Sequence, residues 1–143
     1  MFLKPVTFLR HVPNPTGCWP SLVQNSNRTG KLITDSIQVA HLSDGPHDQS
    51  GQTVIVDGIR CRFPDGTIAG SSLTLDAAVR NFRAHTGLPL WRVVNMASLY
   101  PARSVGVDDR KGSLLPGRDA DILIADGDFR LRGIWIRGER LEG

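Results

Sequence analysis

Asp35 ends the apolar run KLITD and is the residue whose type and position best suit catalysis in this sequence. The run reads as a short buried strand. A carboxylate at the C-terminal end of a parallel strand can take up and release protons at the mouth of a barrel. Composition alone favours a simpler role, a helix cap or turn acid after an edge strand, so both interpretations stay open at this point.

Four other side chains could do chemistry, and their contexts argue against it. His41 and His47 each stand alone in the sequence, without the close pairing of two metal-ligating histidines, so we expect exposed loop histidines. Ser71 and Ser72 follow AG rather than lying in a G-x-S-x-G turn, which argues against a serine nucleophile.

The cysteines and the charge exclude several classes of protein. Cys18 and Cys61 have no CxxC partner, so they are expected to be thiols in a reducing compartment. The formal charge is +3, but the arginines alternate with acids and form no run, which indicates a solvated surface rather than nucleic-acid binding. No stretch reaches the ~18 apolar residues of a membrane span, and no cleavage site follows the start. We therefore expect a cytoplasmic protein without nucleic-acid or membrane partners.

The first half of the chain changes character at residue 31. Residues 1–30 are rich in Pro, Asn, Ser and Gly without regular periodicity, which predicts an irregular or poorly ordered segment. Residues 52–58 and 59–63 read as two strands joined by an Asp57-Gly58 turn. FPDGT adds a further turn, and the small residues IAGSS read as a loop.

Helical patterns follow, and then strands return. Residues 74–87 predict a helix with Thr74 as N-cap and Gly87 as its stop. A second helix is expected over residues 89–100 and a short third one from Pro101. ADILIADG, apolar on both faces, predicts a buried strand. RLRGIWIRGERL alternates and predicts another strand, with one face carrying Leu131, Ile134 and Ile136 and the other carrying Arg132, Trp135 and Arg137. This order of elements indicates an α+β fold.

Three longer stretches resemble one enzyme family. LITDSIQVAHLSDG, DGTIAGSSLTLDAAVRN and MASLYPARSVGVDDRKGSLLPGRDADILIADGDF, with the closing WIRGERL, look like the C-terminal portion of N-acetylglucosamine-6-phosphate deacetylases in the amidohydrolase superfamily. The resemblance covers roughly residues 31–141. KGSLLPGRDADILIAD is similar to amidohydrolases in general, and TIAGSSLTLDAAVRN to these deacetylases in particular.

The resemblance implies a site and a substrate class. Asp35 matches the aspartate that takes a proton from the attacking water and passes one to the departing amine. Ala69, Gly70 and Ser71 match a segment near the substrate, an N-acetylated amino-sugar phosphate. The family also implies a divalent metal, zinc or iron, held by a glutamate and two histidines on earlier strands. Upstream of Asp35 the sequence has one histidine, His11, and no glutamate, so this chain alone is not expected to bind the metal.

The implied fold is a partial α/β structure, the end of a metal-dependent (β/α)8 barrel with strands of a small β-sandwich. Residues 31–120 are expected to form the barrel end with an inserted hairpin and helices, and residues 121–143 the sandwich strands. The expected activity is hydrolysis of an acetamide by a truncated chain that is inactive alone. Two alternatives remain, a non-catalytic remnant or interaction module and another cyclic-amide amidohydrolase. TIAGSSLTLDAAVRN argues against the second.

Two consequences of the resemblance concern stability. His41 stands where the family commonly has glycine, so a backbone needing positive φ there would cost ~1 kcal/mol. Ser36 replaces a usual alanine. The stripe Val93, Val94 and Ala97 is expected to be exposed for want of neighbours, which favours a homo-oligomer or a complementing chain.

Overall fold

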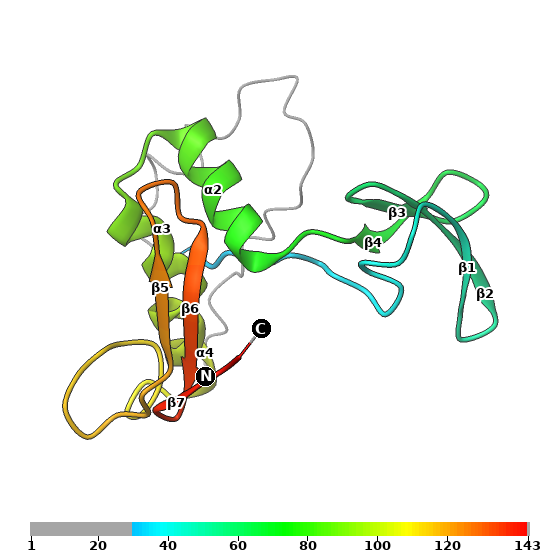
Figure 1. Cartoon of the computed structure of the whole chain (residues 1–143). Coiled ribbons are helices and arrows are strands. Elements are labelled where there is room, and N and C mark those ends of the chain that lie inside the picture. Colours follow the sequence, from blue (N-terminus) through cyan, green and yellow to red (C-terminus); the bar gives the residue numbers. More distant parts are fainter. Residues whose placement is uncertain (1–29, 143) are drawn as a thin grey trace, which may run out of the picture.

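The computed structural model describes residues 30–142, which form two groups of elements (Figure 1). A four-stranded antiparallel sheet projects away from the other described elements. Its strands, in spatial order, are β1 (Gly45–Gln49), β2 (Gln52–Asp57), β3 (Arg60–Arg62) and β4 (Ile68–Ser71). The predicted hairpin is confirmed, since β2 and β3 pair antiparallel through a loop in which Gly58 has φ 57°. The predicted irregularity of residues 1–30 lies outside the described residues, apart from Gly30.

A small core holds this sheet together. Val54, Val56 and Cys61 point to one face, where they are buried with Val39 from the turn that precedes β1. Because side chains alternate along a strand, the opposite face carries exposed residues such as Ile55 and the two arginines that end β3. The sheet therefore buries one face only, and its core is separate from that of the helices.

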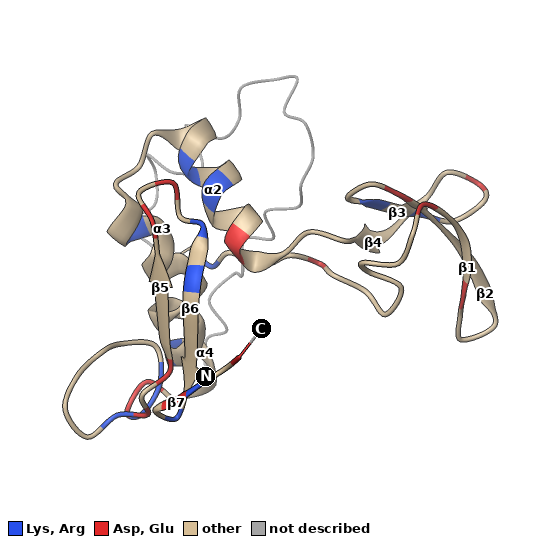
Figure 2. Cartoon of the chain, viewed as in Figure 1, with Lys and Arg blue, Asp and Glu red and all other residues tan. Residues whose placement is uncertain are grey.

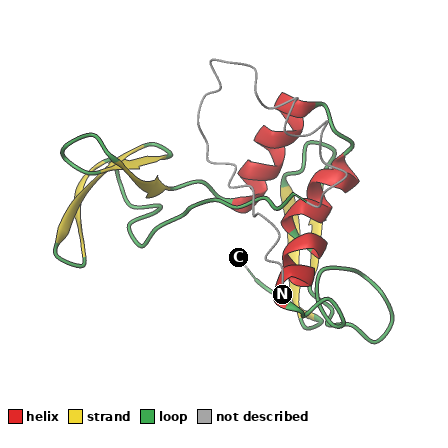
Figure 3. Cartoon of the chain, turned by 180° about the vertical axis from the view of Figure 1, so that it is seen from behind, coloured by secondary structure: helices red, strands yellow, loops and turns green. Residues whose placement is uncertain are grey.

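The second group contains three helices and a second sheet. The helices are α2 (Leu75–Thr86), α3 (Leu90–Ala97) and α4 (Leu99–Val105), and the sheet has the order β5 (Ile122–Ala125), β6 (Leu131–Ile136), β7 (Glu139–Arg140). The helices lie on one side of β5 and β6, as Figures 1 and 3 show from opposite sides. Their core contains Leu32, Leu73, Ala78, Val79, Phe82, Val93 and Met96.

The helix predicted from Thr74 to Gly87 is confirmed, whereas the second helix ends at Ala97 and not at the predicted residue 100. Thr74 accepts a hydrogen bond from the Ala77 N–H, and Gly87 ends α2 in the left-handed conformation with φ 67°. The third helix begins at Leu99 rather than at the predicted Pro101. Proline is tolerated there because the first N–H groups of a helix have no partner inside it.

Residues 31–35 do not form the predicted strand. A single parallel bridge pairs Ser36 with Ser71, and upstream of it the Leu32 N–H donates to the Met96 carbonyl oxygen at 2.8 Å. A strand needs a neighbour along its whole length, and here the segment bonds to a helix end and to β4 instead. The predicted IAGSS loop is likewise wrong, because residues 68–71 pair with β3 as β4.

Two predictions of burial are also wrong, in opposite directions. The stripe expected to be exposed on α3 is covered, since Val93 is fully buried and Val94 and Ala97 pack against the helical core. The strand that was expected to be buried, β5, is exposed to solvent, since Leu123 is 56% and Ile124 50% exposed. The reason is the size of the second sheet, whose three strands leave apolar side chains on both faces without cover among residues 30–142.

A β-bulge explains the face pattern of β6. Leu123 lies opposite Ile134, and Ala125 lies opposite Leu131, with the register shifting between them. Since cross-strand partners share a face and β5 alternates regularly, the bulge places Leu131 on the face of Ile134, as the sequence pattern predicts.

Basic and acidic residues are interspersed over these elements (Figure 2). Both signs gather where the loop after α4 meets β7. No helix in the described part of the chain combines the length and apolar character needed to cross a bilayer. The division of the chain near residue 120 stays a prediction.

Candidate functional site

Asp35 lies where the segment leaving the helical core meets β4. Its backbone has φ 54°, in the left-handed region that non-glycine residues seldom adopt, although Asp is among those that do. The residue is half-buried, and its carbonyl oxygen accepts the Ser71 N–H at 2.8 Å. The predicted catalytic residue thus has a defined backbone conformation and contacts β4 directly.

Gly70 makes the approach between the two segments possible. A methyl group on its Cα would lie 2.4 Å from Cγ2 of Ile37 and 2.9 Å from the Asp35 carbonyl oxygen. Both are shorter than any stable van der Waals contact. The glycine at position 70 is therefore explained by the backbone of residues 35–37 lying against β4.

Ser71 joins these segments with its side chain as well as its backbone. Its hydroxyl donates to the Thr34 carbonyl oxygen at 2.5 Å and accepts the Leu73 N–H at 3.2 Å. Its own carbonyl oxygen accepts the Ile37 N–H at 3.3 Å. Ser71 is 7% exposed, so these bonds are shielded from water.

The structure brings Asp35 together with Gly70 and Ser71, and their roles in catalysis and substrate binding stay predictions. Ala69 is the neighbouring residue on β4 and packs against the small core of that sheet. What the sequence reasoning missed is the role of Ser71 in bonding the backbone around Asp35. A serine separated from its partner by more than thirty residues gives no local signal of such a contact.

The other candidates, His41, His47 and Ser72, lie in the sheet of β1–β4 or beside it. The expectation of an exposed loop histidine is wrong for His47, which is half-buried in β1, where its Nε2 lies 2.7 Å from the Ser43 carbonyl oxygen just before the strand. His41 is exposed and has φ 69°, so the position that was expected to need positive φ does have it. The Ser72 hydroxyl lies 3.5 Å from the Cys61 thiol beside the sheet core.

The residues described do not provide a donor set for a metal ion. Within residues 30–142, no group of three or more His, Cys, Asp and Glu side chains is arranged to hold one. The zinc or iron that the resemblance implies does not fit the residues present in this part of the chain.

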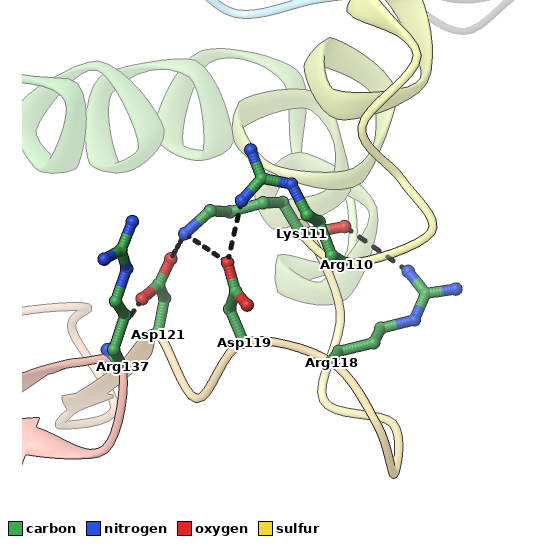
Figure 4. Close-up of polar contacts among 6 residues, drawn as sticks. All are labelled: Arg110, Lys111, Arg118, Asp119, Asp121 and Arg137. Atoms are coloured by element: carbon green, nitrogen blue, oxygen red, sulfur yellow. Dashed lines mark hydrogen bonds and ion pairs between the residues drawn. The ribbon is translucent and has the colours of Figure 1, made fainter.

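A second polar cluster lies far from Asp35 in the sequence, in the loop between α4 and β5 (Figure 4). The Lys111 ammonium contacts Asp119 at 2.9 Å and also contacts Asp121. The Asp121 carboxylate also accepts the Arg137 N–H at 3.0 Å, which ties the loop to the turn after β6.

Hydrogen bonds in this cluster shift three pKa values. The hydrogen bond from Lys111 lowers the pKa of Asp119 and, with the Arg137 N–H, that of Asp121. The same carboxylates raise the pKa of Lys111, Asp121 contributing most. The cluster explains why KGSLLPGRDAD carries closely spaced opposite charges, and its contacts are structural.

Comparisons with known proteins place this geometry in a family. Residues 11–141 match the Amidohydrolase family. An N-acetylgalactosamine-6-phosphate deacetylase from Escherichia coli O157:H7 is 43% identical over 108 residues, covering 76% of this chain and 29% of the relative. An N-acetylglucosamine-6-phosphate deacetylase from Bacillus subtilis is 39% identical over 97 residues, covering 68% of this chain and 24% of the relative.

A solved structure matches in three dimensions. The N-acetylglucosamine-6-phosphate deacetylase from Thermotoga maritima superposes with a TM-score of 0.78 at 30% identity, covering 85% of this chain and 34% of the other. The chain thus spans about a third or less of the length of these three relatives. With a family match over most of its length, it belongs to the amidohydrolase family, and its sheets and helices form part of the amidohydrolase fold seen in these deacetylases.

Proposed function

We propose that this chain is the C-terminal part of a deacetylase that hydrolyses the acetamide of an N-acetylated amino-sugar 6-phosphate. The observation that carries the proposal is the pairing of Asp35 with the AGS segment of β4, in a chain 39% identical to an N-acetylglucosamine-6-phosphate deacetylase. We also propose that the elements 31–120 are the end of the barrel and those after residue 120 belong to its small β-sandwich. A cytoplasmic location stays a prediction.

Asp35 is the residue we assign to proton transfer. Its carboxylate would take a proton from the water that attacks the acetamide carbonyl and give one to the amine as the carbon–nitrogen bond breaks. An amine is a poor leaving group until it is protonated, so both halves of this exchange lower the barrier. A half-buried position suits the role, since such a carboxylate reaches solvent while its backbone is fixed.

We assign substrate contact to the backbone of Ala69 and Gly70, with Ser71 at the end of the same strand. A glycine beside a reacting group lets the main chain approach a sugar closely. The Ser71 hydroxyl already has a donor and an acceptor partner in the protein, so its contact with substrate would use its remaining lone pair.

The amino sugar has two candidate identities. The resemblance of the sequence motifs points to N-acetylglucosamine 6-phosphate. The identity to a relative named for N-acetylgalactosamine 6-phosphate is 43%, against 39% for the B. subtilis relative, which makes the galactose isomer a second candidate. The two differ in the configuration of one hydroxyl, so a direct comparison of turnover decides between them.

The metal ligands would come from residues other than 30–142, because this part of the chain holds no suitable cluster. We therefore expect activity only when the other barrel strands, with the metal ligands, are present. The contrasting proposal is a remnant or interaction module with an idle Asp35, and the other cyclic-amide hydrolases remain a weaker alternative.

Complementation tests the proposal. The B. subtilis deacetylase, truncated to remove the part that this chain matches, is mixed with the purified chain, zinc or iron, and each amino-sugar phosphate in turn. The proposal expects amine release that needs the chain and is abolished by Asp35→Asn but not by Asp109→Asn, a change at an exposed acid outside the site. Binding of the two polypeptides without turnover would support the interaction module instead, and turnover by Asp35→Asn would overturn the role of Asp35.

A further inference from the structure

Ser71 contacts the backbone on both sides of Asp35. The Thr34 carbonyl oxygen accepts its hydroxyl, the Asp35 carbonyl oxygen accepts its N–H, and the Ile37 N–H donates to its carbonyl oxygen. Three successive bonds from one residue thus fix the path of residues 34–37. This arrangement uses both hydrogen-bond donors of Ser71, its hydroxyl and its N–H.

These bonds surround a backbone conformation that is unfavourable by itself. Asp35 has φ 54°, where the Cβ of an L-residue crowds the neighbouring carbonyl oxygen. Such conformations persist when the surrounding structure determines them, and they cluster at functional sites. Because the backbone dihedral angles set the direction of the Cα–Cβ bond, whatever holds φ at residue 35 also directs the carboxylate.

We propose that the Ser71 hydroxyl is a positioning group that holds Asp35 in its left-handed conformation and so aims the carboxylate for proton transfer. The part of this proposal that concerns proton transfer rests on the proposed function. The part that concerns the conformation of Asp35 depends on this chain alone. Ser71 acts on Asp35 through the main chain. Its side-chain bond to Thr34 is the one contact in the set that a substitution can remove while leaving the backbone donors and acceptors in place.

The burial of the hydroxyl strengthens the effect. Ser71 is 7% exposed, so a lost hydrogen bond at the Thr34 carbonyl is not readily replaced by one to water. Ser72, the next residue and the first after β4, offers a contrast. Its hydroxyl contacts the Cys61 thiol, a weak partner, and makes no bond to residues 34–37 among the described hydrogen bonds.

The test is nuclear magnetic resonance on the isotope-labelled chain, which needs no turnover. The three-bond coupling between the amide and Hα protons of Asp35 reports φ, and hydrogen exchange reports the bonds of the Ser71 and Ile37 amides. In Ser71→Ala we expect the coupling to change and both amides to exchange about tenfold faster, the effect of losing one buried hydrogen bond. Ser71→Thr, which keeps the hydroxyl, should restore both signals, and Ser72→Ala should alter neither.

Unchanged coupling and exchange in Ser71→Ala would overturn the positioning role. If that variant does not fold, Ser71→Cys fills the same volume with a weak donor, and its comparison with Ser71→Thr decides in the same way. The failure of the proposed function would look different, because complementation would then be absent with wild-type Ser71 while the Asp35 signals still depended on the hydroxyl. In an active complementation mixture, Ser71→Ala should lower kcat through Asp35 and raise KM through the substrate contact proposed for the same hydroxyl, so the Asp35 coupling and not KM tests the positioning role.

Discussion

Gly70 lies against Asp35 so closely that a methyl group on the glycine would stand 2.9 Å from the aspartate carbonyl oxygen. The contact joins β4 to the segment that enters it from the helical core. Asp35 is held at the position where these two segments meet, and the geometry of the candidate site depends on a residue without a side chain.

We therefore expect Gly70→Ala to destabilise the chain by about 2 to 3 kcal/mol, the usual cost of forcing an added group into packed surroundings. The matched control is Gly66→Ala. Gly66 also has positive φ, at 86°, but open space around it, so its cost should be about 1 kcal/mol. Urea unfolding measures both values. Equal losses of unfolding free energy in the two variants would mean that the close approach at Gly70 adds no cost beyond that of its positive φ.

His41→Gly should stabilise the chain by about 0.5 to 1 kcal/mol. His41 has φ 69°, and glycine adopts that conformation without the crowding of a Cβ, although its freedom in the unfolded chain offsets part of the gain. Ser43→Gly, at an exposed neighbour without positive φ, should instead lower stability. Thermal melting compares the two, and a loss of stability in both variants would contradict the prediction.

The elements that the sequence predicts well are those set by local signals. Thr74 and Gly87 define the ends of α2 because a cap and a left-handed stop act within one turn of the helix. The hairpin of β2 and β3 follows from its turn in the same way. None of these elements depends on a distant partner.

The predictions that were wrong concern partners far along the chain. Residues 31–35 were expected to be a strand, but a strand is defined by its neighbours, and here the contacts come from Ser71 and Met96. The burial of Leu123 and of Val93 depends equally on what covers them, which periodicity does not reveal. Of the site, the identity of Asp35 came from family resemblance, and its contact with Ser71 only from the fold.

The open second sheet should make the chain associate at high concentration. On β5, which lies at an edge of that sheet, Leu123 is 56% exposed, and Ile136 lies on the same face, 49% exposed. Exposed apolar groups on an edge strand are a common route to association, and lysine at such a position opposes it. We expect Leu123→Lys to weaken self-association about tenfold, as measured by sedimentation velocity.

Leu42→Lys is the matched control for this prediction. Leu42 is 50% exposed but lies in the turn before β1, away from the second sheet, so its substitution should leave association unchanged. Equal weakening by both substitutions would indicate a nonspecific effect of charge, and a chain that stays monomeric at every concentration would remove the basis of the prediction.

The cluster around Lys111 should make stability depend on pH at both extremes. Asp119 and Asp121 have pKa values below their ordinary 3.8 because Lys111 bonds to their charged forms, so their contribution is present above that pH and lost as pH falls through the lowered values. The pKa of Lys111 is raised above its ordinary 10.5, so its contribution is present below that pH and lost as pH rises through the raised value.

Lys111→Met should therefore lower the free energy of unfolding across the neutral range. The difference from wild type should narrow below pH 3.8 and above pH 10.5, and also in ~1 M salt, because these pairs are partly exposed and open to screening. Lys31→Met is the control, since Lys31 is in no ion pair within residues 30–142, and its effect should not vary over the same pH range. Denaturant unfolding at a series of pH values measures both variants. A Lys111→Met difference that stays constant from acid to alkaline pH would mean that packing of the lysine side chain, rather than its charge, stabilises the loop.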